Sequence, residues 1–296
     1  MTGTGSPGRC AWLGATTPRP FWVAVVVAST AAWFLVGSVD APPGFDWVIY
    51  GDAFRRWQET GSPYLAMAAG WDPCREFPYL YPPSSWPLLP LASVLPYQLL
   101  AVGAMPLLGA APRLALLPAA AVLLFLGLGP GLYLANINVL VVGLLAISFR
   151  AGRLSGVAFS LAVALKGYPL VLLPLLWGDR ARLRWFAGVL AALVASGTVL
   201  FGPGAWIDLA VTLLGQGSHC DVLLNPLAGL GWWRLVPAGL MVLVGWRLHS
   251  PTLTLLGGTL GTGVVTRHYL PTLAAVLPFE VDRAMRSPAQ PARADR

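Results

Sequence analysis

The chain has 296 residues, of which 56% are hydrophobic and only 10% are charged, and its mean hydropathy is +0.68. A soluble globular chain carries roughly 25% charged residues, so this composition excludes an ordinary soluble enzyme domain and a disordered chain. The formal net charge is +7, but the arginines stand in short clusters between apolar blocks, unlike the basic, aromatic-interleaved face of a nucleic-acid-binding protein. Such clusters are typical of cytoplasmic loops, so the sequence predicts an all-α, polytopic membrane protein of the cell membrane.

The pattern divides the chain into a membrane domain and two short cytoplasmic tails. The predicted parts are a tail over 1–20, the membrane domain over 21–280 and a second tail over 281–296. The first apolar segment, 21–39, carries no charge and leaves the cytoplasm after Arg19. It is a retained anchor in this interpretation, and a cleavable signal peptide is the alternative. Residues 40–76 then form one long extracytoplasmic loop that holds six of the chain's 12 acids.

Two long uncharged stretches follow this loop. Residues 77–112 contain five prolines between Pro82 and Pro96, which predicts a broken or partly re-entrant helix near the start of the stretch. Residues 114–149 are longer than the ~20 residues that one crossing needs. We expect the Gly129-Pro130-Gly131 break and the polar Asn136 and Asn138 to split them into an outward and an inward helix.

The segment over 154–178 has basic residues at both ends and the chain's only lysine, Lys166, in its middle. One straight crossing would leave one of the two basic clusters outside the membrane. A hairpin of two short helices keeps both clusters inside, as the distribution of basic residues in membrane proteins requires. The sequence therefore predicts a hairpin whose tip carries Lys166 at the outer side.

The remainder of the chain supplies the later segments. The expected parts are an outward helix over 185–201, an outer loop over 202–227, a return over 228–246, and a last pair over 251–266 and 269–279 that turns at Arg267-His268. About ten membrane segments result, several of them short, with both termini inside. Short segments need protein neighbours or local bilayer thinning.

Residues 46–60 in the first outer loop read as an amphipathic helix lying on the membrane. Tyr50, Ala53, Phe54 and Trp57 share one stripe at helical spacing, and Gly61 with Pro63 ends the helix. Asp46 begins the same stripe, four residues before Tyr50. A carboxylate facing an apolar site has a raised pKa, as a general base requires, whereas the alternative interpretation is a helix N-cap.

Four polar positions, Asp46, Asn138, Lys166 and His268, are expected at or near the same outer face. Polar groups at membrane depth are costly and commonly line a cavity or pair with one another. For Lys166 the alternative is a side chain that only snorkels to the interface, and for Asn136 and Asn138 it is a bond between helices. Tyr79 and Tyr81 fit an aromatic belt at the interface.

Several short motifs occur in order over roughly residues 40–280. They are Phe45-Asp46-Trp47-Val48-Ile49-Tyr50, Gly61-Ser62-Pro63-Tyr64, Phe77-Pro78-Tyr79-Leu80-Tyr81-Pro82-Pro83, Asn136-Ile137-Asn138, Ala164-Leu165-Lys166-Gly167-Tyr168-Pro169 and His268-Tyr269. Together they resemble glycosyltransferase family 87, the polyprenyl-phosphate-mannose-dependent α-mannosyltransferases of the GT-C membrane fold. The chain departs from the family where Ala135-Asn136 replaces the usual Gly-Gln and where Thr266-Arg267-His268 replaces the usual Trp-x-His-His.

The resemblance implies transfer of a sugar, with inversion, from a lipid phosphate carrier to a lipid or glycan acceptor on the extracytoplasmic face. The family's general base maps onto Asp46. The resemblance implies no metal or other cofactor, only the lipid-linked donor as co-substrate. The leaving phosphate is negative and needs cations or strong donors nearby. The candidates for this role are Lys166, His268, Arg267 and Arg75, and those for the substrate cavity are Tyr50, Tyr81, Asn136 and Asn138.

Two other function classes fit the same polar positions. A transporter or lipid flippase would also place Asp, Lys and His in a membrane cavity, although its two halves should resemble each other and these do not. A non-catalytic family member acting as a scaffold would need none of them. Cys74 and Cys220 both fall in outer loops, where we hypothesise a disulfide between them.

Overall fold

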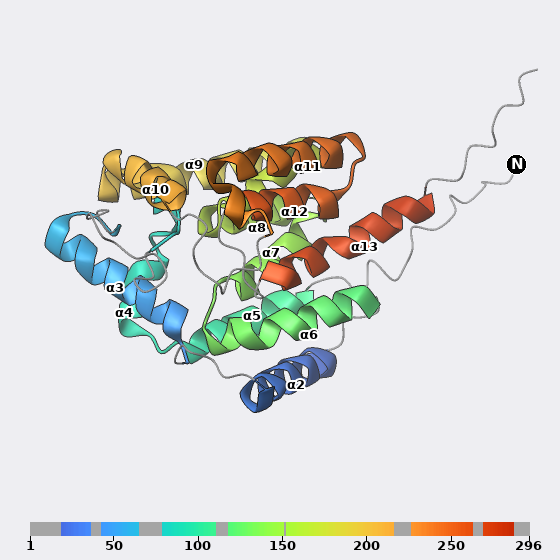
Figure 1. The fold of residues 1–296 in the computed structure, drawn as a ribbon, viewed down its shortest axis with the longest axis horizontal. Coiled ribbons are helices and arrows are strands. Elements are labelled where there is room, and N and C mark those ends of the chain that lie inside the picture. Colours follow the sequence, from blue (N-terminus) through green and yellow to red (C-terminus); the bar gives the residue numbers. More distant parts are fainter. Residues whose placement is uncertain are drawn as a thin grey trace, which may run out of the picture.

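The computed structural model describes residues 19–36, 43–64, 79–110, 118–150, 152–215, 226–262 and 269–286. All regular secondary structure in these ranges is helical, which confirms the all-α fold class (Figure 1). The α-helices are α2 (Arg19–Val36), α3 (Phe45–Thr60), α4 (Leu88–Val94), α5 (Gln98–Ala110), α6 (Pro118–Tyr133), α7 (Asn138–Ser148), α8 (Arg153–Leu165), α9 (Arg180–Phe201), α10 (Gly204–Gly215), α11 (Leu235–Arg247), α12 (Pro251–Gly261) and α13 (Leu270–Arg286). Three 3₁₀ segments join them, η1 (Pro83–Ser85), η3 (Tyr168–Leu176) and η4 (Ala228–Arg234).

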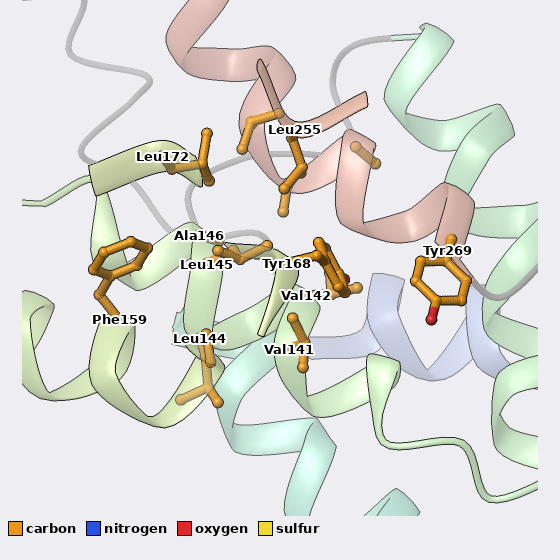
Figure 2. Close-up of a cluster of buried hydrophobic side chains, with 14 of the residues drawn as sticks. Val141, Val142, Leu144, Leu145, Ala146, Phe159, Tyr168, Leu172, Leu255 and Tyr269 are labelled. Atoms are coloured by element: carbon orange, nitrogen blue, oxygen red, sulfur yellow. The ribbon is translucent and has the colours of Figure 1, made fainter. Parts of the chain in front are cut away.

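The helices surround two hydrophobic cores. The larger core draws on α5 to α8, η3, α12 and α13, and Figure 2 shows part of it, with residues such as Val142, Leu172 and Leu255. The smaller core lies under α3 and α4, on the left of Figure 1, and contains four tyrosines. Leu140 and Leu165 pack against both cores. The short link between α6 and α7 contributes Ala135 and Ile137 to the smaller core, so the junction of the two cores lies beside this link.

The segment 153–178 is a hairpin whose first and last residues lie close together. The carboxylate of Asp179 accepts hydrogen bonds from the backbone N–H groups of Gly152, Ala181 and Arg182 at 2.9–3.1 Å, which joins the start of α8 to the start of α9. These backbone N–H groups, first that of Arg182, hold the pKa of Asp179 below its usual range. Lys166 follows the last residue of α8 and lies at the opposite end of the hairpin, as the charge pattern predicts.

Close helix contacts depend on glycines at which a side chain would have no space. A Cβ at Gly197 in α9 would lie 2.4 Å from the carbonyl oxygen of Pro83, and one at Gly156 in α8 would lie 2.3 Å from that of Arg182. A Cβ at Gly257 in α12 would meet the backbone of α11 in the same way. Small residues that let backbones approach closely are typical of helix packing in membrane proteins.

Gly197→Ala is expected to destabilise the protein, because the new methyl group would push η1 away from α9. Overpacking of this kind costs about 1–3 kcal/mol. Gly188, on the same helix, has no atom within 4 Å of its would-be Cβ. Gly188→Ala should therefore be neutral, or stabilising by up to about 1 kcal/mol through helix propensity. Thermal unfolding of both variants in detergent measures the difference, and equal midpoints would contradict the close contact.

The stretch over 114–149 contains two helices, α6 and α7, as predicted, and the break between them lies at 134–137, next to Asn136 and Asn138. The structure differs from the prediction at Gly129-Pro130-Gly131, which does not break the helix. α6 runs through all three residues to Tyr133. The hydroxyl of Ser29 in α2 donates to the carbonyl of Phe125 and accepts from the N–H of Gly129, so both groups of one helical turn are satisfied from outside. This contact lies in the turn before Pro130, which itself removes the N–H that would have bonded to the carbonyl of Leu126. The glycine serves close contact between α2 and α6 instead of a turn.

The expected outer loop over 202–227 also differs, because residues 204–215 form the apolar helix α10. Its residues Ala205 and Leu209 are buried in the smaller core. Asp208 is the only charged residue of α10, so the segment had no charged face that would have indicated an amphipathic helix.

One helix of the described part of the chain, α9, has the length and hydropathy of a membrane crossing. It has 22 residues, its most apolar 18-residue stretch has a mean hydropathy of 1.7, and only 11% of that stretch is buried within the protein. Several shorter helices, among them α6, α7 and α8, are also apolar. Large hydrophobic side chains are widely exposed on α9, α11 and the helices around them, for example Val199 at 83% and Leu240 at 57%.

Candidate functional site

The start of α3 is fixed against the end of α6 by two backbone hydrogen bonds. The N–H of Gly44 donates to the carbonyl of Tyr133 at 2.7 Å, and the N–H of Asp46 donates to that of Leu134 at 2.9 Å. Gly44 has φ 75°, and a Cβ there would lie 2.7 Å from the ring of Tyr97. Only glycine meets both demands without strain. The backbone of Asp46 is thus held beside the α6–α7 link.

That link begins with a Schellman turn that terminates α6. The N–H of Asn136 bonds to the carbonyl of Gly131 at 2.7 Å, and the N–H of Ala135 bonds to that of Leu132 at 3.1 Å. Ala135 occupies the left-handed position, with φ 57°, where glycine is usual. The strain of an alanine in this conformation is about 1–2 kcal/mol. The turn aims the Asn136 side chain back toward α3.

Asn136 holds the carboxylate of Asp46 through an amide whose orientation is fixed. Its Oδ1 accepts the backbone N–H of Asn138 at 2.9 Å, and because a backbone N–H can only donate, this atom must be oxygen. The other end of the amide, Nδ2, then donates to Oδ2 of Asp46 at 2.5 Å. Oδ1 of Asp46 has no hydrogen-bond partner among the described residues.

The surroundings of Asp46 change the pKa of its carboxyl group. Burial raises the pKa of the carboxyl above its ordinary value of 3.8, while the hydrogen bond from Asn136 and the charge of Lys166 act in the opposite direction. The alternative interpretation, that Asp46 caps its helix, does not describe the structure. Gly44 is the residue at the cap position of α3, and the cap has no side-chain hydrogen bond.

Lys166 lies between two tyrosine rings. Its ammonium is 4.3 Å from the centre of the Tyr81 ring and 5.2 Å from that of Tyr269, and it donates to the Tyr269 hydroxyl at 3.4 Å. Cations are attracted to ring faces at such distances. Lys166 forms no direct ion pair with Asp46, but its charge acts on that carboxyl. The side chain is half-buried, so it does not simply extend to the surface.

Tyr81 reaches Lys166 because η1 is fixed between two helices. The hydroxyl of Ser84 donates to the carbonyl of Ala164 at the end of α8 at 3.0 Å, and the indole of Trp86 donates to Ser196 of α9 at 2.9 Å. Tyr79 and Tyr81 are 1% and 6% exposed. They are therefore buried beside the site, where the sequence had favoured an interfacial belt.

Tyr50 lies on the inner face of α3, as its stripe predicts, and its ring centre is 4.7 Å from that of Tyr81. Asn138 is the first residue of α7, and its Oδ1 accepts a hydrogen bond from the Tyr168 hydroxyl at 3.4 Å. The Tyr50 hydroxyl and Asn138 Nδ2 are fully buried without a hydrogen-bond partner among the described residues. All four residues expected to line a substrate cavity, Tyr50, Tyr81, Asn136 and Asn138, are buried in close packing in this conformation.

We call the group of Asp46, Tyr50, Tyr81, Asn136, Asn138, Lys166, Tyr168 and Tyr269 the polar cluster. Of the residues predicted for the site, it contains Asp46, Lys166, Tyr50, Tyr81, Asn136 and Asn138. Arg75, Arg267 and His268 lie outside the described residues, as do Cys74 and Cys220 of the hypothetical disulfide.

Tyr168 and Tyr269 are members of the polar cluster that sequence reasoning did not select. Their ring centres are 5.4 Å apart, and both residues belong to the larger core, part of which Figure 2 shows. Both tyrosines stand inside short motifs noted in the sequence, Tyr168 two residues after Lys166 and Tyr269 next to His268. Tyrosine next to a charged residue is too common to have indicated a site.

The chemistry of the polar cluster is that of one acid, one cation and several neutral donors. Within the described ranges, no three His, Cys, Asp or Glu side chains lie close enough together to hold a metal ion. Such a cluster can take a proton at Asp46 and stabilise negative charge near Lys166. No known protein family, curated protein or solved structure matches the chain.

Proposed function

We propose that the chain is a membrane glycosyltransferase that moves a sugar, mannose by the resemblance of its motifs, from a polyprenyl-phosphate carrier to a lipid or glycan acceptor. The observation that carries the proposal is the polar cluster, which contains an oriented carboxylate and a lysine that influence each other without forming an ion pair. A structural salt bridge would bring the two charges into contact. Two separated charges suit a reaction in which one group takes a proton and the other faces a departing anion.

In the proposed reaction, Oδ1 of Asp46 takes the proton of the acceptor hydroxyl. The acceptor oxygen forms the new bond to the anomeric carbon from the side opposite the leaving group, and the bond from that carbon to the phosphate oxygen breaks. The electron pair leaves with the polyprenyl phosphate. Asn136 keeps Oδ2 occupied, so Oδ1 is the oxygen available for the proton. Burial supports this role because it raises the basicity of the carboxylate.

We further propose that Lys166 stabilises the departing phosphate, together with Arg75, Arg267 and His268. Lys166 has only one polar partner among the described residues, the Tyr269 hydroxyl at 3.4 Å. An ammonium has three N–H donors, so further donors remain for a ligand. Phosphate oxygens are suitable acceptors for such charge-assisted hydrogen bonds.

We place the chain in the cell membrane in about ten segments, with the polar cluster toward the extracytoplasmic side. The wide exposure of large hydrophobic side chains supports this arrangement, because lipid is the solvent in which such a surface is favourable. A small apolar cavity of about 230 Å³ is lined by Phe54, Trp57, Trp86 and neighbours from α4 and α9. Leu89, Phe54 and Phe201 of its lining also belong to or pack against the smaller core, and the cavity suits the first isoprene units of a polyprenyl carrier.

The direct test uses membranes that contain the full-length chain and polyprenyl-phosphate mannose labelled in the sugar. Wild type should transfer label to a lipid or glycan acceptor, and Asp46→Ala should not. The proposal is wrong if wild type transfers no label to any acceptor in the host membrane. It is equally wrong if Asp46→Ala transfers as well as wild type.

Asn136→Ala is expected to lower kcat roughly 10-fold, because a carboxylate that loses a charge-assisted hydrogen bond worth about 1.5–3 kcal/mol is less well oriented. The same change removes one of the influences that lower the pKa of Asp46, so the acid limb of the pH–rate profile should move to higher pH. Asn136→Gln keeps an amide donor and should recover part of the rate. A loss of rate without movement of the acid limb would mean that Asn136 only supports the fold.

A further inference from the structure

A second feature lies at the opposite end of the hairpin from Lys166. A groove with a volume of 590 Å³ follows about three turns of α9, beginning at its first turn and bordered by the start of α8. Its lining includes Arg153, Arg184, Trp185, Gly188, Val189 and Ala192. Its size falls within the roughly 300–1,000 Å³ of small-molecule sites.

One end of the groove carries two arginines without partners. Arg153 and Arg184 are exposed, and neither forms an ion pair or a hydrogen bond with any other described residue. Arg182, also in the first turn of α9, differs from them. Its guanidinium donates to the Ser155 hydroxyl and to the Arg150 carbonyl, and it lies 3.8 Å from the Asp179 carboxylate. The groove therefore has two guanidinium groups that remain available for an anion.

The rest of the groove is apolar. Gly188 has no atom within 4 Å of the position that a Cβ would occupy, so space is open directly above its backbone. Ala192 also lines the groove, one turn of α9 beyond Gly188. At 1.5 Å per residue, Arg184 and Ala192 are about 12 Å apart along the helix. The groove thus matches a ligand with an anionic head and an apolar chain.

We propose that this groove binds an anionic glycerophospholipid of the cytoplasmic leaflet. Its phosphate lies between Arg153 and Arg184, and one acyl chain follows Gly188 and Ala192. Basic pockets between helices at the cytoplasmic side are suited to anionic headgroups. Trp185, next to Arg184 and 44% exposed, is a residue type that favours the membrane interface, as the proposed headgroup position requires. The site is distinct from the polar cluster, and it shares with the proposed function only the premise that the chain spans the membrane.

The test is native mass spectrometry of the purified, delipidated full-length chain with phosphatidylglycerol or phosphatidylcholine of identical acyl chains. Wild type should retain phosphatidylglycerol more tightly. Two arginines near a headgroup contribute about 1 kcal/mol each, so the double variant Arg153→Gln/Arg184→Gln should bind phosphatidylglycerol roughly 30-fold more weakly. Gly188→Leu, which fills the apolar strip, should also weaken binding although the arginines are intact.

The matched control is Arg180→Gln/Arg247→Gln, which removes the same charge from exposed arginines that do not line the groove. This control should bind as wild type does. Equal retention of the two lipids, or equal weakening in the two double variants, would overturn the proposal. Displacement of the lipid by glycerol 3-phosphate would do the same, because a headgroup site alone needs no acyl chain. A wild type that binds phosphatidylglycerol but transfers no mannose would refute the proposed function and leave this site intact.

Discussion

Asp46→Asn is expected to reduce sugar transfer by about 10²–10⁴-fold, the usual contribution of a general base. Asparagine has nearly the same shape and can still accept the hydrogen bond from Asn136, so the geometry of the polar cluster should persist while the base is lost. The measurement is kcat for transfer of labelled mannose at saturating donor. A thermal midpoint equal to that of wild type should accompany the loss.

The matched control is Asp52→Asn, on the solvent-facing side of the same helix. Asp52 is paired with Arg55 and lies away from the polar cluster. Its replacement should change kcat by less than about 2-fold, since exposed ion pairs contribute little. If the two asparagine variants lost the same activity, the effect would belong to the charge of α3 and not to a base at Asp46.

The pH dependence of the wild type follows from the same carboxyl. A base acts only when it is ionised, and burial raises the pKa of Asp46 above 3.8. Activity should therefore fall on acidification at a higher pH than an ordinary aspartate would give. A pH–rate profile with its acid limb at the ordinary aspartate value would contradict the buried setting.

Lys166→Met is expected to reduce kcat by about 10²–10³-fold, the usual cost of removing one group that stabilises charge in the transition state. Methionine keeps an unbranched apolar stem that can still pack against the Tyr81 and Tyr269 rings. The loss should therefore appear in kcat with little change in thermal stability. Because the charge of Lys166 lowers the pKa of Asp46, the remaining activity should have its acid limb at higher pH.

Two further variants separate charge from structure at this position. Lys166→Arg retains the charge and should keep more activity than Lys166→Met, though less than wild type because the planar guanidinium requires different space. Arg55→Met removes an exposed charge of α3 and should leave transfer unchanged. If Lys166→Met kept full activity, Lys166 would be only an interfacial side chain, the alternative that its place at a hairpin tip allows.

The sequence alone determined the features that depend on neighbouring residues. The helix predicted over 46–60 is α3, and Gly61 ends it in the left-handed conformation with its N–H bonded to the Trp57 carbonyl at 2.8 Å. The stripe that begins at Asp46 faces inward, with Tyr50 and Ala53 buried. Helical spacing, glycine and proline act locally, so their effects can be predicted from a few adjacent residues.

The hairpin over 154–178 also followed from the sequence, because basic clusters flank an apolar run. Its tip at Lys166 comes before Gly167 and Pro169, which do not continue α8. The charge rule limits which ends of segments can share a side of the membrane. It therefore brought Lys166 toward the same side as Asp46 without giving any contact between them.

Only the tertiary structure decided which distant residues meet. Asn136 and Asp46 are 90 positions apart, and their bond depends on a turn at Ala135 and a glycine at Gly44 that no local rule connects. The hydroxyl of Ser29 in α2 bonds to Phe125 and Gly129 of α6, about 100 positions away, and no local pattern indicated this contact. Because burial and partner choice are properties of the packed chain, the roles of Asn136 and Tyr269 became visible only there. The sequence determined which polar groups exist and on which helix faces they lie, and packing decided which of them touch.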